Sequence, residues 1–566
     1  MLVDLMTAQG RQLMHSAETP WTVYPRPQMR RDSYINLNGF WEFSVDYENK
    51  GLIRVPFCPE SMLSGYGKHF EEGSLLQYNR TFTLPENFSR GRVLLHVGAA
   101  DQRANVFVNG KPVGNHEGGY EAFCFDITDV LTENNRLSIC CFDDLTDQSY
   151  PYGKQTQNRG GMWYTPVSGI WQTVWLESVP ETYIEKLSIE NKGYSVTIQI
   201  QPQMDGVVKV DQLGTFAMVN GSVTITPEDP HVWSPEDPFL YDFVVEAGED
   251  RVASYFAIRN LEVKKVGQYP RLCLNGKPYF FHGLLDQGYW PDGLFTPAKP
   301  ENYAHDILAM KKLGFNTLRK HIKVEPEEFY YQCDKLGMIV WQDMVNNSDY
   351  SFVRDTVIPT LGIQKLNDRN LHNDPKSRQR FYDAMTATVN QLKNHPCICY
   401  WTIFNEAWGQ FDSDRVYADF RKLDDSRFID STSGWFRQKM TDVDSRHVYF
   451  RKVKLKGDGK KPLVLSEFGG KTYPCAEHVF NPDKSYGYGG CDSLQALSEA
   501  VSKLYLDEIL PCVKKGLCAA IYTQVSDVED EINGLLTYDR AVEKLTPETM
   551  LPIAKALQCA MSEEER

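Results

Sequence analysis

The stretch that decides the fold of this chain runs Asn394-His395-Pro396-Cys397-Ile398-Cys399-Tyr400-Trp401-Thr402-Ile403-Phe404-Asn405-Glu406. Its middle is a short, largely apolar run, which predicts a buried strand. The run ends in an amide and a carboxyl group. We therefore expect the side chains of Asn405 and Glu406 to emerge at the C-terminal end of this strand.

A second stretch has the same design, Pro462-Leu463-Val464-Leu465-Ser466-Glu467 followed by Phe468-Gly469-Gly470. The glycines let the backbone turn tightly beside a ligand. Two carboxyl groups at the ends of two apolar strands suit a retaining glycosidase, with Glu406 as general acid/base and Glu467 as nucleophile. The plain alternative for Glu406 is a carboxylate that caps the next helix or pairs with an arginine.

Other residues at strand ends would support this pair. Asn405 would hydrogen-bond the 2-hydroxyl of the sugar, and Arg319 would hold Glu467 ionised unless it forms only a surface salt bridge. Tyr449 would also hydrogen-bond Glu467, and its alternative is a core tyrosine. At least one of three tryptophans should form a sugar platform, although each alone fits a core position as well: Trp341, Trp408 and Trp435.

The composition of the chain limits the classes of partner that we expect it to bind. A net charge of −15 and a pI near 5.4 argue against nucleic acid or an anionic membrane as partner. No apolar stretch is long enough to span a membrane, and the first 20 residues lack the apolar core of a signal peptide. Thirteen cysteines, several of them within apolar runs, indicate free thiols in a reducing cytoplasm. Metal-binding spacings of Cys and His are absent, so we expect no metal and no cofactor.

The sequence pattern changes twice along the chain and predicts three domains. Residues 1–180 contain short alternating segments separated by turns, which predict a jelly-roll β-sandwich. Residues 181–263 suit a smaller immunoglobulin-like sandwich. In residues 264–566 apolar strands alternate with helical stretches, which predicts a (β/α)8 barrel. Its expected strands are Tyr279–Leu285, Asn316–Lys320, Met338–Trp341, Ile398–Phe404, Phe428–Ser433, His447–Phe450, Leu463–Ser466 and Ala519–Gln524.

The two glutamate motifs, together with stretches of the N-terminal part, resemble glycoside hydrolase family 2, which includes bacterial β-galactosidase and β-glucuronidase. The resemblance spans nearly the whole chain, and it implies a jelly roll, an immunoglobulin-like domain and a catalytic barrel with retention of configuration. The N-terminal stretches that carry it are Leu37-Asn38-Gly39-Phe40-Trp41-Glu42-Phe43, Val55-Pro56-Phe57-Cys58-Pro59-Glu60-Ser61, Val108-Asn109-Gly110, Gly118-Gly119-Tyr120 and Ser168-Gly169-Ile170-Trp171-Gln172-Thr173-Val174-Trp175.

Departures from the family pattern bear on the substrate. After the first barrel strand, Asp286 or Gln287 replaces a histidine that contacts substrate in many members. After the second strand the chain reads His321-Ile322-Lys323-Val324, unlike the large β-galactosidases. After the eighth strand, the acidic loop 527–534 stands in place of the Asn-x-Lys motif of β-glucuronidases. We expect it to repel a uronate, or else to bind an ion or be solvated. Three lysines near strand ends are cations that suit a uronate, so a uronidase is kept as an alternative: Lys320, Lys323 and Lys471.

The sequence thus predicts a cytoplasmic, retaining exo-β-glycosidase that acts on a neutral sugar, with a β-galactoside as the first choice. A β-glucuronidase or β-galacturonidase is the alternative within the family. A carbohydrate-binding protein without catalytic activity is the alternative from another class. A carbohydrate is the expected partner, and self-association into a homo-oligomer stays open. Three residues at or beside the third and eighth strands complete the candidate site: Asp343, Tyr522 and Gln524.

Overall fold

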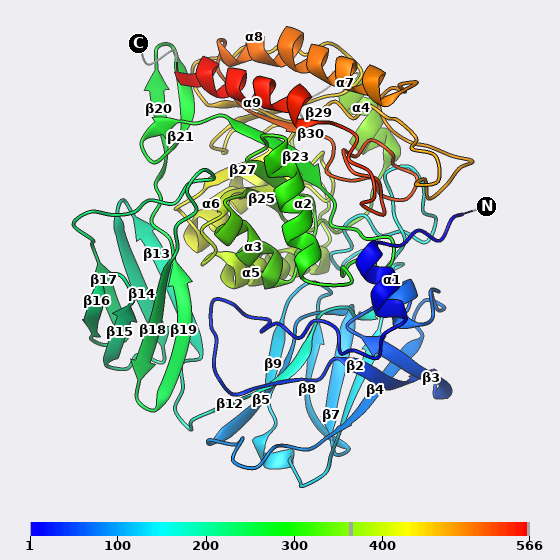
Figure 1. The fold of residues 1–566 in the computed structure, drawn as a ribbon, viewed down its shortest axis with the longest axis vertical. Coiled ribbons are helices and arrows are strands. Elements are labelled where there is room, and N and C mark those ends of the chain that lie inside the picture. The colour runs from blue at the N-terminus through cyan, green and yellow to red at the C-terminus, as the bar shows by residue number, and fades with distance from the viewer. Residues whose placement is uncertain (1, 362–365, 563–566) are drawn as a thin grey trace.

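The first unit of the computed structural model, which describes residues 2–361 and 366–562, is an antiparallel β-sandwich (Figure 1). Alternate residues of its strands face inward and form a core of their own, which includes Trp41, Tyr78 and Leu176. One sheet has the order β1 (Tyr34–Asn36), β12 (Val174–Val179), β5 (Arg92–Val97), β9 (Phe123–Asp126). The other has the order β3 (Glu48–Val55), β2 (Gly39–Val45), β4 (Leu75–Phe82), β10 (Asn135–Phe142), β7 (Arg103–Val108), β8 (Lys111–Glu117).

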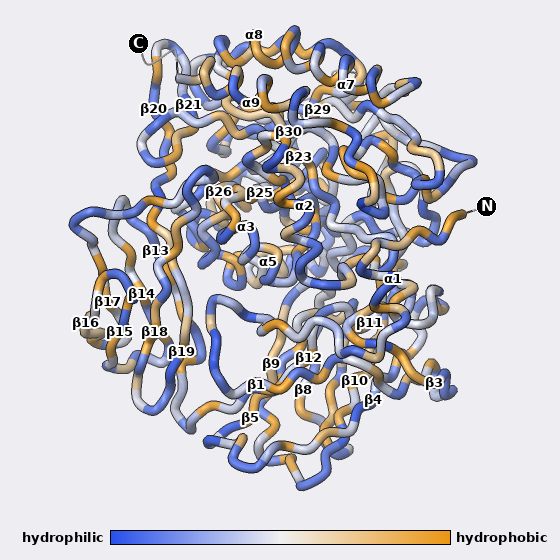
Figure 2. The backbone as a smooth tube through the Cα atoms, in the orientation of Figure 1, coloured by the Kyte–Doolittle hydropathy of each residue, from blue (hydrophilic) through white to orange (hydrophobic). Residues whose placement is uncertain are grey.

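The second unit is a smaller antiparallel sandwich with a separate core. Figure 2 shows the reason, because hydrophobic and hydrophilic residues alternate along its strands, so that one side of each strand faces inward. One sheet has the order β13 (Lys186–Lys192), β14 (Ser195–Gln201), β17 (Ser222–Ile225). The facing sheet has the order β16 (Gly214–Met218), β15 (Gly206–Val210), β18 (Tyr241–Ala247), β19 (Asp250–Phe256).

A three-stranded antiparallel sheet of β20 (Leu261–Val266), β21 (Tyr269–Leu274) and β22 (Lys277–Pro278) leads into the third unit, a parallel (β/α)8 barrel. Its strands are β23 (Phe281–Asp286), β24 (Thr317–Lys320), β25 (Ile339–Asp343), β26 (Ile398–Asn405), β27 (Phe428–Ser433), β28 (Asp444–Val448), β29 (Leu463–Phe468) and β30 (Leu517–Tyr522). Ladder hydrogen bonds join them in the order β27-β26-β25-β24-β23-β30-β29-β28, and β27 contacts β28 where the barrel closes. The predicted fold class is therefore correct.

Helices pack around the outside of the barrel, as Figure 1 shows. They are α2 (Glu301–Lys312), α3 (Glu327–Leu336), α5 (Pro375–Leu392), α6 (Ser413–Leu423), α7 (Leu494–Lys503), α8 (Leu510–Val513) and α9 (Pro547–Ser562). Because helices cover the outer face and side chains fill the interior, every residue of β26, β27, β29 and β30 is buried. This explains why β26, β29 and β30 are largely apolar runs rather than alternating ones, whereas β27 buries four polar residues after Phe428 and Ile429.

Strand six lies earlier than the sequence predicts. The apolar residues suggested His447–Phe450, but β28 spans Asp444–Val448 and pairs with β29 through Asp444, Ser445 and Arg446. Phe450 is 81% exposed and lies beyond the strand. The error arose because this strand begins with three polar residues, so hydropathy marked only its end.

The chain before β1 packs on the barrel as well as on the first sandwich. Leu5, Leu13 and Trp21 belong to the large barrel core. In α1 (Ala8–Met14) the N-cap residue Thr7 donates through its amide and hydroxyl to the buried carboxylate of Asp292, at 2.9 and 2.5 Å. The N-terminal segment therefore holds the loop after the first barrel strand in place.

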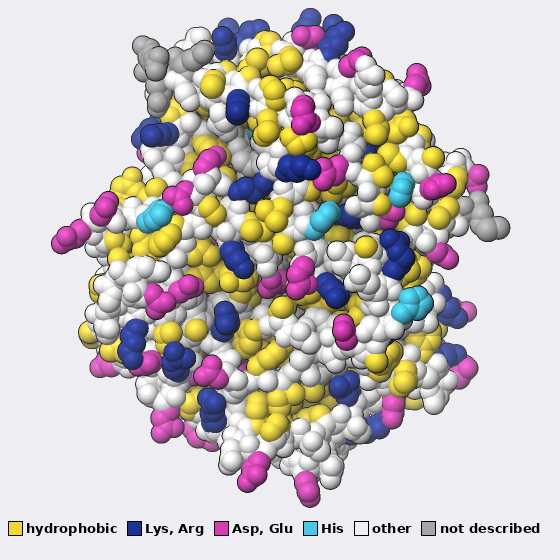
Figure 3. All heavy atoms as spheres, in the orientation of Figure 1, with side chains coloured by type: hydrophobic (Ala, Val, Ile, Leu, Met, Phe, Trp, Pro, Cys, Tyr) yellow, Lys and Arg dark blue, Asp and Glu magenta, His cyan; other side chains and the backbone are white. Residues whose placement is uncertain are grey.

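Among the described residues, the charged surface side chains are of mixed sign and the cysteines form no disulfide. Lys and Arg side chains are interspersed with Asp and Glu on the face seen in Figure 3. The thirteen cysteines are free, and most of them are buried. Within the described ranges, no helix has the length and apolar character needed to cross a membrane.

Candidate active site

Strand β26 ends at Asn405, and the chain turns sharply immediately after it. Glu406 and Ala407 have φ angles of 49° and 68°, in the left-handed region that residues other than glycine rarely occupy. The amide of Glu406 donates to the carbonyl of Ser433 at the end of β27, at 3.0 Å. This turn holds the carboxyl of Glu406 at the C-terminal end of the barrel, with only 8% of the residue exposed.

Strand β29 brings Glu467 to the same end of the barrel. Two glycines follow, with φ angles of 86° at Gly469 and 79° at Gly470. A Cβ atom at Gly469 would lie 2.3 Å from the ring of Tyr522, so only glycine fits this turn. The tight turn thus fixes the direction in which the loop leaves the strand directly after Glu467.

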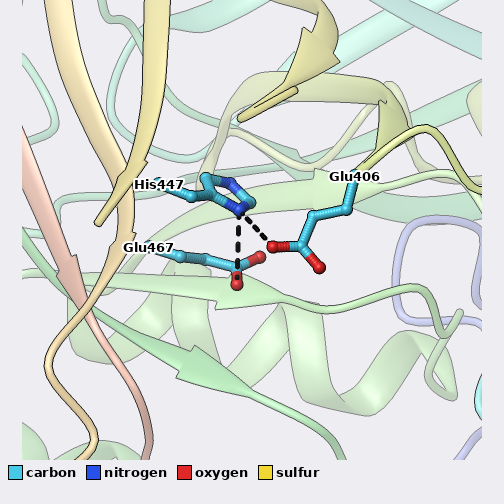
Figure 4. Close-up of side chains that lie close together, drawn as sticks. All are labelled: Glu406, His447 and Glu467. Carbon is cyan, nitrogen blue, oxygen red and sulfur yellow. Dashed lines mark hydrogen bonds and ion pairs between the residues drawn. The ribbon is translucent and has the colours of Figure 1, made fainter. Parts of the chain in front are cut away.

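The two carboxyl groups lie close together, with the His447 ring beside both (Figure 4). One side-chain atom of each of the three residues lies within 4.8 Å of the other two. Carboxyl groups of retaining glycosidases are about 5–5.5 Å apart, whereas those of inverting enzymes are about 6.5–9.5 Å apart. The geometry therefore fits direct attack by one carboxylate. Among the described residues, these three are also the group of acids and histidines that is compact enough for a metal ion.

Arg319, at the end of β24, links the predicted residues into one network. Its guanidinium donates to Glu467 Oε1 at 2.9 Å and to the Asn405 side-chain oxygen at 2.9 Å. Its Nε donates to Asp343 at 3.0 Å. The arginine is fully buried, so it is not a surface salt bridge. Because Arg319 binds the amide oxygen of Asn405, the NH2 group of that side chain stays available as a donor.

The surroundings shift the two carboxyl pKa values in opposite directions. Burial and the charge of Glu467 raise the pKa of Glu406. Burial opposes ionisation of Glu467 too, but nearby cationic groups, Arg319 among them, and the hydroxyl of Tyr449 lower its pKa to about 2. Two carboxyl groups with pKa values driven apart are the arrangement of an acid and a nucleophile.

His447 is a site residue that the sequence reasoning missed. Its Nδ1 lies 2.8 Å from Glu406 Oε1 and 3.6 Å from Glu467 Oε2, and its Nε2 lies 3.1 Å from the Ser433 hydroxyl. It stands two residues before Tyr449, and alternate residues of a strand face the same side. This spacing was the available signal, because the expected strand His447–Phe450 already contained both residues.

The three tryptophans have different positions. Trp341 is fully buried in the barrel, where it stacks on Tyr400 at a centroid distance of 3.9 Å, so it is a core residue and no sugar platform. Trp408 is buried too and stacks on Trp163 of the first sandwich. Trp435 is half-buried and lies 6.3 Å from the His447 ring, so it remains the candidate platform. Tyr488, which stacks on Tyr449 at 4.1 Å, is a further aromatic residue that the sequence reasoning missed.

Models of known protein families match this chain in three consecutive parts. The galactose-binding domain-like model of glycosyl hydrolase 2 matches residues 45–164, and the model of glycosyl hydrolases family 2 matches residues 180–259. The TIM barrel domain of the same family matches residues 264–478, which include both glutamates. The chain belongs to glycoside hydrolase family 2.

Relatives within family 2 carry different names. A β-galactosidase of Thermoanaerobacter pseudethanolicus is 24% identical over 80% of this chain, which spans 63% of that protein. The human β-glucuronidase is 25% identical, and the match covers 80% of each chain. A solved family 2 β-galacturonidase of Eisenbergiella tayi, bound to galacturonate, has a TM-score of 0.67 and 19% identity, with coverage of 95% of this chain and 99% of the other. The chain thus spans less than two thirds of the first of these relatives.

We expected Asp286 or Gln287, after strand one, to contact substrate. Both side chains instead interact with other side chains of the protein. Asp286 pairs with Lys320 at 2.7 Å and keeps part of its side chain exposed. Gln287 is buried and donates to Gln524 at 2.8 Å. Tyr522 is also buried, and its hydroxyl accepts the amide of Lys471 at 2.9 Å. Gln287, Gln524 and Tyr522 therefore act as supports for the loops of strands one, seven and eight.

The carboxylates of the acidic loop after strand eight are all held by partners within the protein. Asp527 pairs with Lys544 at 2.7 Å, and Arg159 pairs with Asp530 at 3.0 Å and with Glu529 at 3.4 Å. Glu531 accepts hydrogen bonds from Tyr164 and Asn533. Every carboxylate of the loop has a donor, and all are buried. Two cations, Arg159 and Lys544, thus offset part of the charge of the four carboxylates, which the sequence did not show, and repulsion of a uronate by this loop stays a prediction.

Proposed function

We propose that this protein is a retaining exo-β-glycosidase that hydrolyses a terminal β-linked sugar. The observation that carries the proposal is the pair Glu406 and Glu467, close together at the C-terminal end of the barrel with pKa values shifted in opposite directions. Membership of glycoside hydrolase family 2 supports the same reaction.

The chemistry proceeds in two steps at this pair. Glu406, in its protonated form, gives its proton to the glycosidic oxygen while the Glu467 carboxylate attacks the anomeric carbon and the aglycone leaves. Glu406 then removes a proton from water, which attacks the glycosyl-enzyme ester and frees Glu467. Asn405, fixed by Arg319, offers its NH2 group to the 2-hydroxyl of the sugar. The sugar has the same anomeric configuration at the start and the end.

A sugar acid is the substrate class that we favour. Six curated relatives are β-glucuronidases by name and one is a putative β-glucuronidase, and similar solved structures include β-glucuronidases and a β-galacturonidase. The neutral-sugar prediction depended on repulsion by the loop 527–534, whose carboxylates are all partnered. A β-galactoside is the second candidate, since one relative at 24% identity is a β-galactosidase.

A panel of 4-nitrophenyl β-D-glycosides tests this proposal: glucuronide, galacturonide, galactoside, glucoside, mannoside and arabinoside. We expect turnover of a uronide with kcat/KM at least about tenfold above that of the neutral sugars, because binding a charged group typically contributes more than 1 kcal/mol. Turnover of the galactoside alone would replace the favoured substrate by the second candidate. If no glycoside were hydrolysed but sugars bound, the protein would be a carbohydrate-binding protein on this scaffold.

A further inference from the structure

A segment of the first sandwich, residues 148–165, lies against the loops of the barrel that surround the catalytic pair. It comes between β10 and β12, far from the barrel in sequence. The Tyr152 amide donates to the carbonyl of Asn346 at 3.1 Å, and the Tyr152 hydroxyl donates to the carbonyl of Ser348 at 2.8 Å. Both partners lie in the loop after β25. The start of the segment is thus fixed to the barrel by backbone groups.

The other half of the segment is fixed to the loops after β26 and β30. The Trp163 ring stacks on Trp408, two residues beyond Glu406, at a centroid distance of 5.2 Å. Arg159 and the amide of Thr165 bind carboxylates of the loop after β30, the latter at 2.9 Å. Segment 148–165 therefore forms a wall beside the site, held against three loops of the barrel.

Lys154 projects from this wall with its ammonium group between aromatic rings. Its Nζ lies 5.6 Å from the centre of the Tyr164 ring and 5.8 Å from that of Trp408, within the range of cation–π attraction. The residue is only 7% exposed. Its charge reaches the catalytic centre, because it favours the ionised form of Glu406 and so acts against the raised pKa of that carboxyl.

The Lys154 ammonium differs from the other cations around the strand ends. Arg319 is bound by Asp343 and Glu467. Lys320 and Lys323 share the buried carboxylate of Glu325, at 2.8 and 3.0 Å. Among the described residues, the Lys154 ammonium contacts no carboxylate and no hydrogen-bond acceptor. An ammonium without a counter-ion on a side chain that is largely buried is a ready partner for a ligand that supplies the missing charge.

We infer that Lys154 binds the carboxylate of a sugar acid in the substrate and so determines specificity for β-uronides. The inference rests on the proposed glycosidase function and adds the residue that binds the carboxylate of the sugar. An Nζ–H donor and a carboxylate form a charge-assisted hydrogen bond, which is stronger than a bond between neutral groups. The site is completed by a residue of the first sandwich, outside the barrel that holds the catalytic pair.

Binding of that carboxylate also prepares the acid catalyst. In the free enzyme the Lys154 charge favours the ionised form of Glu406. A bound carboxylate neutralises this charge and brings its own negative charge near Glu406, and both changes favour the protonated form that the first step needs. The correct substrate therefore promotes protonation of its own catalyst, whereas a neutral sugar leaves Lys154 uncompensated.

The test compares Lys154→Met with Lys154→Arg, which keeps the charge. Lys471→Met removes another cation beside a barrel strand end, and Lys209→Met removes an exposed lysine of the second sandwich. Each variant is assayed with 4-nitrophenyl β-D-glucuronide, β-D-galacturonide and β-D-galactoside, and its unfolding midpoint is measured. We expect Lys154→Met to lower kcat/KM for the uronides about 100-fold and that for the galactoside less than threefold. Lys154→Arg should restore part of the loss, and the two other variants should stay within threefold of the wild type.

A second readout separates charge recognition from a structural role. For the uronide, the basic limb of the kcat profile in wild-type enzyme should lie at higher pH than that of kcat/KM, and Lys154→Met should remove the difference. Equal losses on charged and neutral glycosides would overturn the inference, as would a uronide loss confined to Lys471→Met. Hydrolysis of neutral glycosides without any uronide activity would overturn it and leave the glycosidase proposal intact. A wild-type protein that hydrolyses no glycoside would overturn both.

Discussion

At the scale of single residues, the environment assigns the two glutamates different roles. Glu406 and Glu467 are chemically identical and both buried, yet only Glu467 receives the guanidinium of Arg319 and the hydroxyl of Tyr449. The acid catalyst should therefore matter most when the leaving group is poor. We expect Glu406→Gln to lower kcat/KM for an unactivated aryl glycoside about 1000-fold, and that for the dinitrophenyl glycoside far less. Equal losses on both substrates would contradict its role as acid.

The same residues determine the pH dependence. Glu467 must be ionised to attack, so activity is lost as the pH falls through its pKa of about 2. Glu406 must be protonated for the first step, so activity is lost as the pH rises through its raised pKa. We expect a bell-shaped profile of kcat/KM whose basic limb lies above pH 4.5, and Glu406→Gln should abolish that limb. A profile that rises steadily with pH would be inconsistent with this assignment.

Tyr449 supplies one of the donors that keep Glu467 ionised. Its hydroxyl donates to Glu467 Oε2, and its ring is held by stacking on Tyr488. Removal of the hydroxyl should raise the pKa of Glu467 and move the acid limb to higher pH by about one unit. We expect Tyr449→Phe to lower kcat/KM about tenfold or more. An acid limb at unchanged pH would show that Arg319 is sufficient.

At the scale of secondary-structure elements, the apolar strands could be predicted and the supporting contacts could not. The β26 and β29 runs are buried throughout, so hydropathy located Glu406 and Glu467 at strand ends. Strand six begins with polar residues, so hydropathy placed its start three residues too late. The contact of His447 with both glutamates depends on how three strands meet, which no local pattern shows. The loop 527–534 looked like free negative charge because its cations, Arg159 and Lys544, are separated from it in sequence.

The loop after β30 also gives a prediction about stability. Arg159 is the cation next to Asp530 and Glu529, which are both buried. Arg159→Ala would leave two buried carboxylates without it, at a cost of about 2 kcal/mol, since the arginine itself is partly exposed. A lower midpoint of thermal unfolding should result. The decrease should be larger at pH 8 than at pH 5, because burial raises the pKa of Glu529 and so favours its protonated form at the lower pH. An unchanged midpoint would show that the other hydrogen bonds of Asp530 and Glu529 are enough to stabilise the two buried carboxylates.

At the scale of the whole molecule, the catalytic pair belongs to the barrel, but one wall of the site belongs to the first sandwich. Segment 148–165 of the first sandwich is joined to the loops after β25, β26 and β30. The sequence predicts the three kinds of unit because each has its own hydrophobic pattern and core. It does not predict which loop of one unit reaches another, because such contacts have no local periodicity. This is why Lys154 was not among the candidates.

The central claim is that Glu467 forms a covalent bond to the sugar, and the most direct measurement is the mass of the trapped enzyme. The probe is a 2-deoxy-2-fluoro β-glycosyl fluoride of the sugar that the substrate panel identifies, because the fluorine slows hydrolysis of the ester more than its formation. We expect one glycosyl group per chain, located by peptide mass on the peptide that contains Glu467, and none in Glu467→Gln. A glycosyl group on another residue, or turnover with inverted configuration and no adduct, would contradict the account.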